Sequence, residues 1–147
     1  MGHAPVQKFA NGRRHHSFPG DGWTVPRIDV LIYREADGSV PLRDWLAGLQ
    51  AVPRERCLAR LALLEEKGHD LRRPASENLG GGVYELRVKW VNVQLRMLYF
   101  FHGRSAAVVS HGFAKEREVP PREIKLAKER MEKFEQNPAR HTFAQEP

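Results

Sequence analysis

The chain has 147 residues, 41% hydrophobic and 29% charged, a balance typical of one globular domain and not of a disordered chain. Its 24 Lys and Arg against 18 Asp and Glu leave a net charge of +6, which favours an anionic partner, nucleic acid above all. A single cysteine excludes an internal disulfide and fits a reducing cytosol, and because neither a signal peptide nor a run of about 20 apolar residues is present, we expect a cytoplasmic protein without membrane contact.

Residues 1–25 are rich in Gly, Pro, His and Arg and show no sustained period, which predicts an irregular N-terminal arm. The adjacent His15 and His16 have no Cys or acidic partners at the spacing of metal ligands, so we expect an exposed polar pair and no metal site. Two roles remain open for this arm: it contacts RNA through Arg13 and Arg14, or it is a tail without a role.

Next come one strand and two helices. Residues 28–34 (IDVLIYR) are β-branched and apolar and end before an Asp-Gly turn, which predicts a strand. A proline then opens a helix near residues 42–50, and a second proline opens a helix over residues 53–67. Cys57 follows the apolar spacing of this second helix, so we expect a small core residue and not a nucleophile.

Residues 69–82 contain Pro, Asn and three consecutive glycines, which predicts a loop. Because the glycines precede a strand and not a helix, they are no dinucleotide-binding fingerprint. Three strands are expected over residues 83–90, 93–102 and 105–115. A proline pair then opens a last helix over residues 121–136.

The order strand, two helices, three strands and helix predicts an α+β fold, an antiparallel sheet packed against helices. We expect this domain over residues 26–137, followed by a tail over 138–147 that frays. The residues expected to be largely buried in its core are Trp45, Leu61, Leu64, Leu86, Leu95, Met97 and Phe134.

Apolar and charged residues alternate in the first of the three consecutive strands, so Glu85, Arg87 and Lys89 are expected on its exposed face. If the hairpins pair in the usual register, Arg87, Arg96 and Lys115 meet on that face. Two Arg and one Lys together form a phosphate site, because guanidinium groups bind phosphate oxygens in pairs and stabilise charge that develops on them. Solvated strand residues without a role are the competing interpretation.

Val109, His111, Phe113 and Lys115 are expected to share one face of the last strand, since they occupy alternate positions. His111 is a candidate acid or base because histidine titrates near neutral pH, although a strand histidine beside apolar residues is more often structural. The chain has no P-loop, no HExxH, no paired-cysteine zinc motif and no GxSxG.

Five segments follow one another along the chain in the order that is typical of one protein family: DGSVPLRDWLAGL, LALLEEKG, VYELRVKW, QLRMLYFF and VVSHGFAKEREVPPREIKLAKERM. Over residues 28–136 the chain resembles the phage-derived HigB-like branch of the RelE/ParE toxin superfamily. The resemblance implies a microbial-RNase-like fold and the toxin of a type II toxin–antitoxin system. It also implies cleavage of mRNA on the ribosome, and a cognate antitoxin, usually of the helix-turn-helix DNA-binding type, as partner. We expect no metal or other cofactor, because the sequence offers no carboxylate-rich site for Mg²⁺.

The resemblance also assigns roles to residues. Arg87 ends the YELR motif, Arg96 opens R-x-L-Y and Lys115 ends HGFxK, which match the basic catalytic positions of the family. Tyr99 matches an aromatic position of the family. Its place in the strand puts its side chain on the other face of the sheet from Arg96, so we expect a core residue. Glu85 stands where a relative such as RelE has a basic residue, which puts the complete catalytic set in doubt.

Lys89, His111, Phe113 and Arg117 are expected to contact RNA beside the catalytic set. Two alternatives remain open. A ParE-like toxin would act on DNA gyrase and cleave no RNA, and a binding module would keep the fold without the chemistry. Glu85 is the residue that most favours the binding module.

Overall fold

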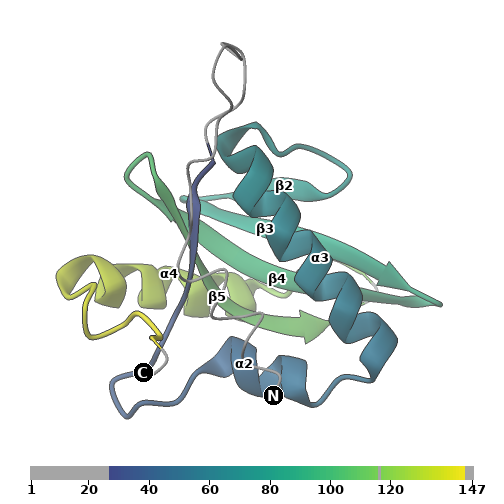
Figure 1. Cartoon of the computed structure of the whole chain (residues 1–147), viewed down its shortest axis with the longest axis horizontal. Helices are drawn as coiled ribbons and strands as arrows, with labels where there is room; N and C mark the ends of the chain where they lie inside the picture. Colours follow the sequence, from purple (N-terminus) through teal and green to yellow (C-terminus); the bar gives the residue numbers. More distant parts are fainter. Residues whose placement is uncertain (1–26, 116, 145–147) are drawn as a thin grey trace.

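A five-stranded mixed sheet forms the centre of the protein, with its strands in the order β1-β5-β4-β3-β2 (Figure 1). The computed structural model describes residues 27–115 and 117–144, so the predicted N-terminal arm lies outside the described residues. In chain order the elements are β1 (Asp29–Ile32), α2 (Pro41–Ala47), α3 (Ala51–Lys67), the short 3-10 helix η1 (Gly68–Asp70), β2 (Ser76–Gly80), β3 (Val83–Trp90), β4 (Val93–His102), β5 (Ala106–Ala114) and α4 (Pro121–Gln136).

The predicted α+β class is confirmed, and the sheet differs from the prediction in two ways. First, β1 pairs with β5 in parallel, so the sheet is mixed and not purely antiparallel. Second, the segment expected to be a loop contains β2, which pairs antiparallel with β3. Its composition hid this strand, because Asn78 and Gly80 are residues typical of turns, and Asn78 Oδ1 accepts a hydrogen bond from Gly80 N at the end of the strand.

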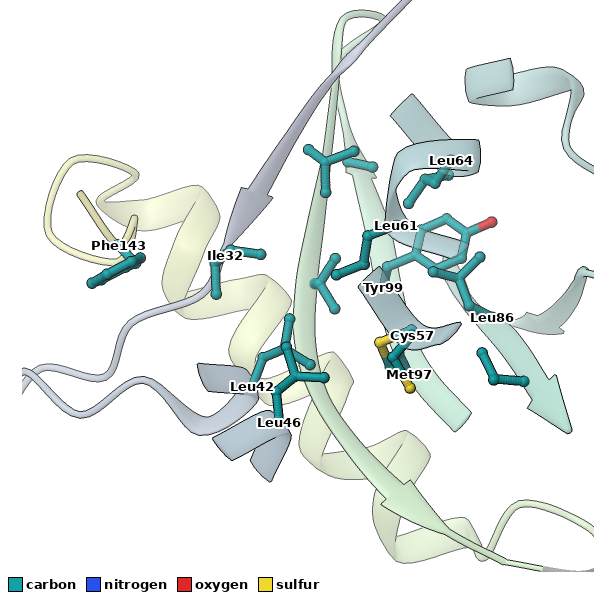
Figure 2. Packing of buried hydrophobic residues seen from close by; sticks show 14 of the residues in the cluster. Ile32, Leu42, Leu46, Cys57, Leu61, Leu64, Leu86, Met97, Tyr99 and Phe143 are labelled. Carbon is teal, nitrogen blue, oxygen red and sulfur yellow. The ribbon is translucent and has the colours of Figure 1, made fainter. Parts of the chain in front are cut away.

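One face of the sheet packs against α3 and α2. Cys57, Leu61 and Leu64 lie at helical spacing on α3 and are fully buried against strand residues such as Leu86 and Met97 (Figure 2). The predicted core is confirmed here, with one exception. Trp45 is only partly buried, because its indole lies over Gly112 of β5 at the margin of the cluster.

The opposite face packs against α4 (Figure 1). Phe134 of α4 is buried against Tyr33, Phe100 and Val108, and Ala127 is buried against other residues of β3 and β4. The expectation that one face of the sheet is exposed is therefore wrong for the part that α4 covers. Alternation of polar and apolar residues indicates two faces but does not say whether a helix covers the second one.

A β-bulge in β5 at Ser110 changes which residues share a face. Leu98 pairs with His111 and Tyr99 pairs with Val109, so Ser110 is an extra residue between two regular stretches. Val109 belongs to the cluster on the α3 face, whereas Phe113 packs in the cluster on the α4 face. The expectation that Val109 shares a face with His111 and Phe113 is wrong, because the bulge inverts the alternation.

The segment after α4 returns to the edge of the sheet. Phe143 N donates to Ile32 O at 2.8 Å, and Thr142 forms an isolated bridge with Tyr33. Phe143 and His141 are buried. Residues 138–144 therefore do not fray as expected, because they complete the hydrogen bonds of β1 and fill its side of the core, while residues 145–147 lie outside the described part.

Candidate functional site

Arg87 and Arg96 lie directly opposite each other on β3 and β4. A two-residue connection, Val91 and Asn92, joins the strands and sets this register, with Trp90 paired to Val93. The usual hairpin register thus brings two of the three expected basic residues together. Both lie on the sheet face that α4 packs against, since their cross-strand neighbour Phe113 belongs to the cluster on that face.

Glu85 lies between the two arginines. Its Oε1 accepts a hydrogen bond from Arg96 Nη1 at 2.6 Å, and its Oε2 accepts one from Arg87 Nε at 3.1 Å. The residue is 1% exposed, so the expectation of an exposed Glu85 is wrong. A buried carboxylate is tolerated where cations and hydrogen bonds compensate its lost hydration, and both of its oxygens are compensated here.

The Arg96 guanidinium holds the chain beyond β5. Its Nη2 donates to Arg117 O at 2.6 Å and its Nε donates to Lys115 O at 3.3 Å, in addition to the bond with Glu85. Only 8% of the side chain is exposed. Because all three nitrogens of Arg96 have protein acceptors, its charge acts mainly on the protein and positions the main chain that carries Lys115 and Arg117.

Arg87 extends the ion-pair network to β2. It pairs with Glu77, which also pairs with Arg73 at 2.9 Å. The Arg87 side chain is 32% exposed, four times as much as that of Arg96, so solvent and ligands reach it. Glu77 is not recognisable as a site residue from the sequence, because its segment has the composition of a loop and a single acidic residue that faces two arginines across a hairpin forms no motif.

Lys115 and Arg117 are exposed and line a recess of about 400 Å³ together with Val93 and Ala114. Lys89 is also exposed, one alternate position from Arg87 on β3, and its carbonyl oxygen accepts a hydrogen bond from Arg56 Nη1 at 3.0 Å. The accessible cations at this end of the sheet thus include Lys89, Lys115 and Arg117.

His111 is held inside the protein. Its Nδ1 lies 2.7 Å from Ser110 Oγ and its Nε2 lies 2.9 Å from Glu123 Oε1, and Arg130 Nη1 donates to Ser110 Oγ. Burial lowers the pKa of His111 below 6.5, and the nearby Arg130 charge acts in the same direction, against the raising effect of Glu123. A buried imidazole with both nitrogens bonded is not placed to contact RNA, whereas the neighbouring Phe113 is half-buried.

The described residues contain no group of three or more His, Cys, Asp and Glu side chains arranged to hold a metal ion. None of the helices in the described ranges is both long enough and apolar enough to cross a membrane. The groups present at this end of the sheet are the guanidinium and ammonium groups of Arg87, Arg96 and Lys115 beside the buried carboxylate of Glu85.

A family model described as phage derived protein Gp49-like (DUF891) matches residues 44–132, from α2 into α4. The matched span includes Glu85, Arg87, Arg96 and Lys115. No curated protein matches the chain.

Proposed function

Because the chain belongs to the phage-derived Gp49-like family, which is of the RelE/HigB toxin type, we propose that it is a HigB-like toxin that cleaves mRNA on the ribosome. The observation that carries the proposal is the bonding of Arg96. This buried guanidinium holds the carbonyl oxygens of Lys115 and Arg117 and, through Glu85, the side chain of Arg87. Basic residues far apart in the sequence are thereby gathered at one end of the sheet.

The roles of these residues follow from their exposure. Arg87, Lys115 and Arg117 are accessible and bind the scissile phosphate and its neighbours, since guanidinium and ammonium groups stabilise negative charge on phosphate oxygens. Arg96 is a positioning residue that acts through the main chain of Lys115 and Arg117. Lys89 extends the basic surface along β3 for the RNA backbone.

The reaction needs no nucleophile from the protein. The 2′-oxygen of the RNA attacks the adjacent phosphorus, the bond from phosphorus to the 5′-oxygen breaks, and a 2′,3′-cyclic phosphate and a free 5′-hydroxyl result. The proton of the 2′-hydroxyl passes to solvent, and the leaving 5′-oxygen gains one. The basic residues stabilise the extra charge on the phosphate oxygens in the transition state, and no metal or other cofactor takes part.

The test is primer-extension mapping of mRNA in a reconstituted translation system. Arg87→Ala and Lys115→Ala should each slow cleavage by about 10²-fold, the scale for loss of one charge-stabilising group. Arg140→Ala is the matched control: Arg140 is exposed and lies in the segment beside β1, at the opposite edge of the sheet from β2. Equal cleavage by wild type and both site variants, or loss of cleavage on metal chelation with intact ribosomes, would refute the mechanism.

Glu85 supports a second candidate, a binding module without catalysis. Its carboxylate offsets one of the two positive charges that a catalytic phosphate site would use, and Glu77 offsets another. If the wild type never cuts mRNA, the binding-module function is favoured over cleavage. A parallel assay with DNA gyrase and supercoiled DNA tests the alternative of a ParE-like toxin.

We propose an antitoxin as the cellular partner, of the helix-turn-helix DNA-binding type. The excess of positive charge suits an acidic segment of that partner, which would cover Lys115 and Arg117 and block access of RNA. Co-expression with the neighbouring gene should relieve growth arrest, and charge reversal at Lys115 and Arg117 should weaken the complex. A complex unaffected by these reversals would place the antitoxin elsewhere.

A further inference from the structure

A second recess, of about 410 Å³, lies at the β2 edge of the sheet. Residues of η1 and the following loop form one side of it, and residues of β2, β3 and β4 form the other. Its ring-bearing strand residues Tyr84, Tyr99 and Phe101 belong to the α3 face, whereas Arg87 and Arg96 lie on the α4 face. The rings of the recess therefore lie on the other face of the sheet from the phosphate site proposed above, although Glu77, which lines the recess, also pairs with Arg87.

Aromatic rings line this recess. The rings of Tyr84 and Tyr99 are stacked with their centroids 5.4 Å apart, and Phe101 meets Tyr84 edge to face at 5.1 Å. The imidazole of His69 is stacked on Phe101 at 3.9 Å. Tyr84 and Phe101 are only partly buried and His69 is exposed, so flat rings border the space. Such rings bind planar ligands by stacking.

Two arginines form the basic rim of the recess. Arg72 and Arg73 are both exposed. Arg73 pairs with Glu77, whereas Arg72 Nη1 donates to the carbonyl oxygens of His69 at 2.6 Å and Leu71 at 3.2 Å. Arg72 has no carboxylate partner within the described residues, so its guanidinium is held in place while its charge is not neutralised.

A polar pair lies at the base of the recess. Ser76 Oγ and Tyr99 Oη are 2.6 Å apart, and both residues are buried. Burial raises the pKa of Tyr99 to about 12, so the hydroxyl is neutral and both donates and accepts hydrogen bonds. Stacking rings, a neutral hydroxyl pair and an unneutralised guanidinium match the three parts of a nucleotide: the flat base, its polar edge and the phosphate.

We propose that this recess binds one nucleotide, with its base against Tyr84 and Phe101 and its phosphate at Arg72. The nucleotide is either a unit of single-stranded RNA or a free nucleoside monophosphate, since both present the same base and phosphate. Binding here does not require cleavage, so this inference stands apart from the proposed enzymatic function.

The experiment follows backbone and aromatic NMR signals of the full chain during titration with each of the four nucleoside monophosphates and with a short single-stranded oligoribonucleotide. A Lys115→Ala background slows any cleavage of the oligonucleotide by about 10²-fold during the titration. Binding should shift the signals of Tyr84, Phe101 and residues 69–73. Saturation by monophosphates identifies a free-nucleotide site, and saturation by the oligonucleotide alone identifies an RNA contact.

Arg72→Ala should weaken binding by about tenfold or more, as expected for loss of hydrogen bonds from a charged donor. Arg140→Ala, with the same loss of charge beside β1, should leave it unchanged. Because Arg72 is exposed, its variant should keep the wild-type spectrum outside the recess. The proposal fails if neither ligand shifts these signals, if Arg72→Ala binds like wild type, or if the control weakens binding equally. If Arg72→Ala still cleaves mRNA but no longer binds the nucleotide, the recess acts independently of the proposed cleavage site.

Discussion

Glu85 and Arg96 form a buried ion pair between neighbouring strands, with 2.6 Å between Glu85 Oε1 and Arg96 Nη1. Removing one partner leaves the other charge buried and unpaired, which costs more than the pair itself contributes. Glu85→Ala should therefore lower the free energy of unfolding by about 3–5 kcal/mol in urea denaturation. Arg87→Ala should cost much less, since solvent already reaches Arg87. Similar losses in the two variants would show that Glu85 is not held as described.

Gly112 of β5 has no room for a side chain. A Cβ added there would overlap the indole ring of Trp45 on α2. Gly112→Ala should lower stability by about 1–3 kcal/mol, the usual cost of overpacking. Gly48→Ala is the matched control, because Gly48 has helical φ and ψ angles and its added Cβ would lie 3.6 Å from the nearest atom. In a Trp45→Leu background the penalty at Gly112 should shrink; a penalty that persists would point to the strand backbone instead.

His111 should make stability depend on pH. Its pKa is lowered in the folded protein, so the unfolded chain binds a proton more readily. The neutral ring accepts from Ser110 at Nδ1 and donates to Glu123 from Nε2, while Ser110 accepts from Arg130; protonation breaks this pattern. The contribution is complete above about pH 6.5 and is lost as pH falls toward the folded pKa.

The check is thermal unfolding of wild type and His111→Gln between about pH 8 and pH 5. Stability of the wild type should fall more steeply on acidification than that of the variant, which lacks the titrating ring. Parallel curves for the two proteins would assign the pH dependence to other groups.

Cys57 should be unreactive in the folded protein. It is fully buried in α3, and burial raises the pKa of its thiol to about 12, so both access and thiolate are lacking. A thiol reagent should modify it at the rate of global unfolding, and the same reagent should react at once in denaturant. Rapid modification of the native protein would show that α3 separates from the sheet on its own.

Much of the fold follows from local patterns. The bounds of β3, β4 and α4 agree with periodicity and proline placement, because these segments are long and regular. β2 was missed because Asn and Gly disfavour strands locally, while pairing with β3 stabilises one here. Glu85 is buried between Arg87 and Arg96 on the face of the sheet that α4 packs against, and alternation within one strand indicates none of these contacts.

The candidate site was predictable only in part. The opposition of Arg87 and Arg96 follows from a short hairpin connection, which limits the possible registers. No local sequence pattern predicts the bulge at Ser110. Because of this bulge, His111 lies in the buried hydrogen-bond network and not on the same face as Val109. The difference between the buried Arg96 and the exposed Arg87 likewise depends on the tertiary contacts of each.

The parallel pairing of β1 with β5 also has a kinetic consequence. Asp29 meets Ala106, whereas β3, β4 and β5 pair through short hairpin connections. Closing long loops costs more chain entropy than forming hairpins, so we expect the hairpins to assemble early and β1 to join late. Val30 and Ile32 become buried only when β1 pairs with β5. We therefore expect their burial to occur in a slow phase of refolding.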